Sequence, residues 1–145
     1  AARATLESFL STRYTRYAID VSKPEASRVS CSRLSPYIAW GNLSIRQVYQ
    51  ALAETRERMG PHRALEAFES RLHWHCHFIQ KFEMECRMEK EDINRGFHAH
   101  PKPRDQSFVD AWAAGRTGYP LIDASMRCLV ATGYCNFRSR AMLVS

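Results

Sequence analysis

Arginine and serine side chains in the first third of the chain have the chemistry needed to bind phosphate. Guanidinium groups pair with phosphate oxygens, and loop hydroxyls and backbone amides donate further hydrogen bonds. Neither a Walker loop nor a GxGxxG sequence is present, which excludes the common nucleotide-binding loops. The set consists of Arg13, Arg16, Arg28, Arg33 and Arg46, the interleaved Tyr14, Tyr17 and Tyr37, and the loop serines Ser30, Ser32 and Ser35. The residues alone thus leave two interpretations open, a phosphate-binding surface or ordinary solvated loops.

A second cluster, HWHCH at residues 73–77, has the residue types of a zinc site. On a helix, however, His73 and His77 share a face, whereas His75 and Cys76 point elsewhere. Four ligands would require partners from distant loops. We therefore predict no metal site and expect these histidines to be hydrogen-bonded or exposed to solvent.

Charge and cysteine content limit the class of protein. The 145 residues carry a formal net charge of +6, which favours a polyanionic partner such as nucleic acid or simply keeps the domain in solution. Five cysteines without a CxxC pair argue against a disulfide framework and favour a cytoplasmic location. No stretch approaches the roughly 18 consecutive apolar residues of a membrane helix, so we expect no membrane partner. The oligomeric state stays open.

Helices are the elements that must position these side chains. Strand-like alternation is nearly absent and helical spacing is frequent, which predicts an all-α fold with about six helices. The helices are expected at residues 1–10, from a capping box at Ser44–Gln47 to Met59, from His62 to about Met88, from Asp105 or Ser107 to Gly115, from 121 to 132 behind Pro120, and from Asn136 onward.

Two adjacent apolar rows run along the helix expected to begin at His62, and such a wide face predicts a central and largely buried helix. We expect Phe78 and Phe82 to lie in the core. Phe68 and Trp74 could belong to the core or to a surface on which a cofactor ring or base stacks.

Three segments resemble the DNA photolyase/cryptochrome family. Residues 31–37 (CSRLSPY) and 41–46 (GNLSIR) are similar to its T-S-R-L-S-P-Y-L…G-x-L-S-x-R pattern. Residues 112–127 (WAAGRTGYPLIDASMR) resemble its W-x-x-G-x-T-G-Y-P-x-V-D-A-x-M-R signature, and the TGY and RSR sequences at 132–134 and 138–140 match T-G-W-x-x-x-R-x-R. The order and gaps fit. The resemblance implies that residues 1–145 are a partial FAD-binding helical domain, truncated on its C-terminal side, without the family's N-terminal antenna domain.

The resemblance also implies which residues bind the cofactor, FAD. The loop from Cys31 to Ser35 is expected to hold its pyrophosphate, with Cys31 in place of the usual threonine. Tyr17, with Tyr14 as a close rival, matches a tyrosine that contacts the flavin phosphates. The full predicted set is Tyr17, Cys31, Ser32, Arg33, Leu34, Ser35, Phe68 and Arg140. Arg140 is expected to pair with a carboxylate that lies beyond Ser145.

A DNA-facing set follows from the same resemblance. Trp74 matches the tryptophan that stacks on a flipped-out pyrimidine dimer, and Arg46 and Arg138 are expected to contact the DNA backbone. Four positions depart from the pattern of dimer photolyases: Arg71 replaces a glutamate, His75 an arginine, Phe137 an asparagine and Ala141 a methionine. The departures weaken the inference of dimer repair more than that of flavin binding.

The resemblance implies a light-driven DNA repair enzyme in which reduced FAD passes an electron to a pyrimidine dimer in double-stranded DNA. A cryptochrome-like photoreceptor with the same cofactor is the main alternative, and a helical DNA-binding module without flavin is another. Because the chain begins without methionine and stops within an apolar run, we expect a fragment. Since the second half of the FAD-binding domain would then be missing, we expect this fragment to be inactive and not to retain FAD firmly.

Overall fold

The computed structural model describes residues 1–101, 103 and 105–144, and this part of the chain contains helices and no strand. The α-helices are α1 Ala2–Ser11, α2 Tyr17–Asp20, α3 Ser27–Ser30, α4 Ser35–Ala39, α5 Ile45–Met59, α6 Arg63–Met84, α7 Gln106–Ala113, α8 Pro120–Thr132 and α9 Phe137–Val144. Three 3-10 segments lie at Arg13–Arg16, Cys86–Glu89 and Arg95–Phe97. The all-α prediction is confirmed.

The prediction of about six helices is wrong, because the described residues form nine. The six expected segments are all helical. The additional helices α2, α3 and α4 have only four or five residues each, too few to produce a periodic apolar pattern. They wind through the polar stretch that carries the candidate phosphate ligands.

Three aromatic rings form the centre of the N-terminal core. Phe9 of α1 is fully buried and meets Tyr17 and Phe68 edge-on, with ring centroids 5.6 and 4.7 Å apart. Tyr17 and Phe68 also contact each other at 5.5 Å. Such pairs contribute about 0.5–1.5 kcal/mol each beyond the area that they bury. Phe68 is therefore a core residue, and the core fixes Tyr17 beside the loop that follows α3.

Predicted helix-start signals are confirmed. Gln47 donates its amide to the Ser44 hydroxyl at 3.1 Å and accepts from the Ser44 amide at 2.9 Å, a complete capping box at the start of α5. Asp105, rather than Ser107, caps α7 by accepting from the Ser107 amide at 2.8 Å. Pro120 stands at the first turn of α8.

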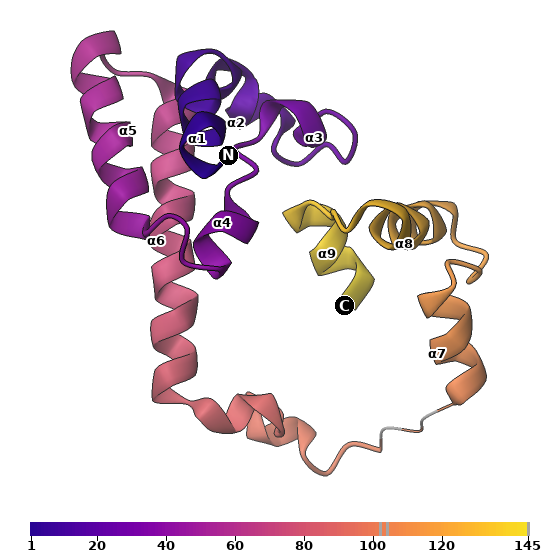
Figure 1. Cartoon of the computed structure of the whole chain (residues 1–145). Helices are drawn as coiled ribbons and strands as arrows, with labels where there is room; N and C mark the ends of the chain where they lie inside the picture. Colours follow the sequence, from indigo (N-terminus) through magenta and orange to yellow (C-terminus); the bar gives the residue numbers. More distant parts are fainter. Residues whose placement is uncertain (102, 104, 145) are drawn as a thin grey trace.

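Only the first half of α6 is buried. Leu65, Phe68 and Leu72 belong to the core, but Phe78 and Phe82 are 52% and 43% exposed, so their predicted core positions are wrong. The helix continues past α4 and α5, the elements beside its first half, before the chain returns through α7 and α8 to α9 (Figure 1). Periodicity identifies the apolar face but not the length over which neighbours cover it. Within the described residues, no helix is long and apolar enough to span a membrane.

One carboxylate holds the connection between α7 and α8. Asp123 accepts hydrogen bonds from the Thr117 amide and hydroxyl at 2.8 and 2.7 Å and from the Gly118 amide at 3.1 Å. The Thr117 hydroxyl, with the two amides and Arg127, lowers the pKa of Asp123 against the opposing effect of burial. The backbone at Gly115 passes so close that an added Cβ would lie 2.8 Å from the Asp123 carbonyl oxygen.

Replacing Gly115 by alanine is expected to destabilise the fold more than replacing Gly133. Both have left-handed φ angles, +62° and +66°, at which an L side chain costs about 1–2 kcal/mol. A Cβ at Gly133 would meet nothing within 4 Å. In chemical denaturation we expect Gly133→Ala to lose about 1 kcal/mol and Gly115→Ala to lose at least ~1 kcal/mol more. Equal losses would contradict the close approach at Gly115.

Stability should fall in acid partly through Asp123. Because its pKa is lower in the folded chain than in the unfolded one, its contribution is complete above the unfolded value of about 3.9 and is lost as the pH falls through the folded value. Asp123→Asn should therefore flatten the acid side of the unfolding-midpoint curve and lower the midpoint at neutral pH. Glu57→Gln, on an exposed α5 position, is the control and should leave both unchanged.

Candidate phosphate-binding site

Residues 31–35, called here the 31–35 loop, lead from α3 into α4. Arg33 has a left-handed φ of +59°, a conformation that costs a non-glycine residue about 1–2 kcal/mol, and Leu34 follows at φ −90°, ψ −14°. A left-handed residue next to a right-handed one turns successive amides toward one concavity, which suits an anion. The amides of Ser32, Arg33, Leu34 and Ser35 donate no hydrogen bond to any residue that the structure describes. The loop thus offers unused donors.

A pocket of about 210 Å³ lies between this loop and the segment from Tyr134 to Arg140. Every predicted cofactor residue except Phe68 lines it: Tyr17, Cys31, Ser32, Arg33, Leu34, Ser35 and Arg140. Phe68 contacts the ring of Tyr17 from within the core. The rival Tyr14 packs against His62, with ring centroids 5.1 Å apart. The cofactor role of these residues stays a prediction, but the fold gathers them around one pocket.

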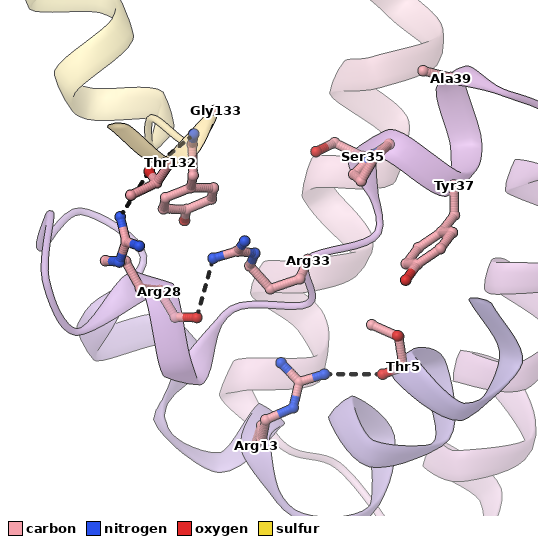
Figure 2. A pocket seen from close by; sticks show the side chains of 11 residues that line it. Thr5, Arg13, Arg28, Arg33, Ser35, Tyr37, Ala39, Thr132 and Gly133 are labelled. Carbon is pink, nitrogen blue, oxygen red and sulfur yellow. Dashed lines mark hydrogen bonds between the residues drawn. The ribbon is translucent and has the colours of Figure 1, made fainter. Parts of the chain in front are cut away.

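A larger pocket of about 880 Å³ shares Arg33, Ser35 and Tyr134 with the first one and adds Arg13 and Arg28 (Figure 2). The guanidinium carbon of Arg33 lies 4.0 Å from the centroid of the Tyr134 ring, and that of Arg28 lies 5.5 Å from it. None of the three arginines forms an ion pair with a carboxylate in the described part of the chain. Their positive charge therefore remains available to attract an anion to the loop.

The Cys31 thiol and the Tyr17 phenol, two ionisable groups of residues that line the smaller pocket, are neutral at physiological pH. Burial, followed by the charge of Asp20, raises the pKa of the Cys31 thiol to about 11. Burial also raises the pKa of the Tyr17 phenol. A thiolate or phenolate would repel phosphate, whereas the neutral groups do not. Replacing threonine by cysteine at position 31 therefore adds no negative charge to the loop.

Asn136 contributes a buried donor with no partner. Its Oδ1 accepts from the Ser139 amide at 2.8 Å and caps α9, while its Nδ2 is buried and makes no hydrogen bond with the described residues. A buried unsatisfied polar group costs about 1–3 kcal/mol, so such groups normally have a partner. Asn136 lines the smaller pocket.

The predicted DNA-facing residues are not gathered into one site. Arg71 and Phe137 do meet, with the guanidinium carbon 5.6 Å from the ring centroid. Trp74 is 48% exposed and lines a shallow pocket with Ser70, His73 and His77, away from the loop. Arg46, His75 and Arg138 are exposed, on α5, α6 and α9 respectively, and none of them lines either pocket beside the loop. Their contacts with DNA stay predictions.

Two further features concern side chains that the motifs do not specify. Within the described ranges, no three His, Cys, Asp or Glu side chains lie close enough to share a metal ion.

Val21, Cys135 and Asn136 line the smaller pocket although the sequence motifs do not select them. Cys135 and Asn136 lie between the TGY and RSR matches, and this position is the only signal that could have indicated them.

Comparison with known proteins identifies the fold and the family. A family described as the FAD binding domain of DNA photolyase matches residues 68–145. The solved structure of a bacterial class III photolyase from Agrobacterium tumefaciens superposes with a TM-score of 0.89 at 25% identity, over 98% of this chain and 29% of that one. A cryptochrome from Synechocystis superposes with a TM-score of 0.79 at 27% identity, over 98% and 30%.

Curated relatives include both kinds of protein in this family. The deoxyribodipyrimidine photo-lyase of Thermus thermophilus is 36% identical over 97% of this chain and 32% of its own length. A cryptochrome DASH of Synechocystis is 32% identical over 79% of this chain and 23% of its own length. The chain thus spans a third or less of these relatives. Together with the helical architecture, these matches show that the chain belongs to the DNA photolyase and cryptochrome family, within its FAD-binding helical domain.

Proposed function

We propose that the full-length protein is a light-driven DNA repair enzyme of the photolyase type, and that this chain supplies part of its FAD site and part of its DNA-binding surface. The observation that carries the proposal is the 31–35 loop, whose unused amides adjoin a pocket that also contains Tyr17 and Arg140. Relatives named deoxyribodipyrimidine photo-lyase support the reaction. The chain covers a third of such a relative, so the activity is proposed for the whole protein.

The residues present fit a diphosphate. The amides of Arg33, Leu34 and Ser35 converge as anion donors, and the Tyr17 and Ser35 hydroxyls border the same pocket. Asn136 lines the same pocket beside them. Bound FAD would absorb light and supply the electron for dimer splitting. The protein's part here is to bind and orient the phosphate end of the cofactor.

The DNA-binding side of the proposal rests on exposed basic and aromatic side chains. Arg46 and Arg138 are exposed and can reach phosphates, and the half-exposed Trp74 offers a ring face for an unstacked base. A formal net charge of +6 favours association with DNA. The expected substrate is double-stranded DNA that contains a pyrimidine dimer.

One contact favours a second candidate, a cryptochrome-like photoreceptor without dimer repair. Arg71 and Phe137 replace the glutamate and asparagine of dimer photolyases. Here they pack against each other, with the guanidinium carbon of Arg71 5.6 Å from the centroid of the Phe137 ring. An arginine cannot accept a hydrogen bond as a carboxylate does. The replacement therefore changes both charge and shape at the proposed lesion pocket while leaving the 31–35 loop intact.

Repair can be tested with FAD-loaded full-length protein and a duplex that contains one thymine dimer. We expect the dimer to be lost under blue light and to persist in the dark. Trp74→Ala should weaken affinity for dimer DNA by about tenfold, because stacking contributes about 1–3 kcal/mol per base. Trp40→Ala removes an 84% exposed tryptophan at the end of α4 and, as the control, should leave this affinity unchanged. FAD-loaded protein that never splits dimers would contradict repair and support the photoreceptor.

The isolated 145-residue chain is expected not to retain FAD. The smaller pocket of about 210 Å³ is bordered by the 31–35 loop and α9, and it offers room for only part of a cofactor as large as FAD. Flavin absorbance after desalting of the purified chain checks this expectation. Stoichiometric flavin would contradict it.

A further inference from the structure

Arg13 uses its whole guanidinium group on the protein itself. An arginine has five N–H donors, and here each nitrogen has an acceptor within the chain. Nε donates to the Ser8 hydroxyl at 3.1 Å, and the terminal nitrogens donate to four backbone carbonyls. The carbonyls belong to Thr5 at 2.9 Å, Val29 at 3.4 Å, Ser32 at 3.5 Å and Cys31, the last by a short hydrogen bond. Figure 2 shows the hydrogen bond from Arg13 to Thr5 of α1. Together with the bonds to Val29, Cys31 and Ser32, it connects α1 to the segment that leads into the 31–35 loop.

The direction of these carbonyls fixes the direction of the loop amides. In a trans peptide the C=O of one residue and the N–H of the next point in opposite directions, and the described chain contains no cis peptide. With the Cys31 and Ser32 carbonyls turned toward Arg13, the amides of Ser32 and Arg33 must point away from it. Both amides lack a partner in the part of the chain that the structure describes.

We propose that Arg13 is a positioning residue for the 31–35 loop: it holds the Cys31 and Ser32 carbonyls so that the amides of Ser32 and Arg33 face the cofactor diphosphate. This inference rests on the proposed FAD site. Arg13 does not bind the phosphate, because its donors are already used. It also holds the strained Arg33 conformation in place, since it fixes the peptide immediately before that residue.

The planar guanidinium is required as well as the charge. Its two ends reach Thr5 on α1 and Cys31 in the loop at the same time. A lysine keeps the positive charge but places its three donors on one nitrogen, so it cannot hold both sides in this geometry. Arg13→Lys would therefore preserve the electrostatic attraction of the cofactor and lose the positioning of the loop, which separates the two effects.

The experiment measures binding of FAD and of riboflavin to the full-length apoprotein. Riboflavin has the flavin ring system but no phosphate, so its binding does not depend on the amides of the 31–35 loop. We expect Arg13→Lys and Arg13→Gln each to weaken FAD binding by at least about tenfold, the loss of one or two charge-assisted hydrogen bonds to the diphosphate. Riboflavin affinity should change by less than about twofold in both variants. Arg3→Gln removes a charge from exposed α1 surface and is the matched control, with no change expected for either ligand.

Three outcomes overturn the inference. Wild-type FAD affinity in Arg13→Lys would show that charge alone matters, and equal losses for FAD and riboflavin would show a general structural defect. If Arg13→Gln fails to fold, as measured by circular dichroism, Arg13→Lys decides the question. Folded wild-type protein that binds no FAD would reject the proposed function, and this inference with it. That failure is distinguishable, since it appears before any variant is made.

Discussion

The candidate site depends on one constraint: several backbone amides must stay unpaired and keep one direction without being buried in a helix or sheet. Free amides are normally satisfied by neighbouring carbonyls, so a loop that keeps them free must have its own carbonyls held elsewhere. Arg13 meets this need for the peptides after Cys31 and Ser32. The left-handed Arg33 then turns the chain so that the following amides share a concavity.

The second wall of the pocket is brought to the loop by contacts between distant parts of the chain. Arg28 donates to the Cys128 thiol and the Thr132 hydroxyl at 3.0 and 3.2 Å, and the Tyr134 hydroxyl lies 3.3 Å from that of Ser27. Arg33 covers the Tyr134 ring. The same TGY turn follows α8, whose entry is fixed by Asp123. The signature around Asp123 therefore acts structurally, since it sets the position from which α8 and α9 reach the smaller pocket beside the loop.

Features that depend on local chemistry can be predicted from the sequence. The Ser44–Gln47 capping box, Pro120 at the start of α8 and the all-α class follow from neighbouring residues, and all are confirmed. Helices α2–α4 cannot be predicted in this way, since four or five residues show no apolar period. The predicted core positions of Phe78 and Phe82 are wrong because an apolar row does not reveal where its covering elements end. The role of Arg13 needed coordinates, since its acceptors are carbonyls, which no side-chain pattern reports.

The most direct test of this account is a crystal structure of the full-length protein with FAD bound. We expect diphosphate oxygens at about 2.9 Å from amide nitrogens of Ser32, Arg33, Leu34 and Ser35, with the Arg13 guanidinium still on the loop carbonyls and not touching the cofactor. A diphosphate held instead by the side chains of Arg13 and Arg28 in the larger pocket, with the loop amides facing away, would contradict it.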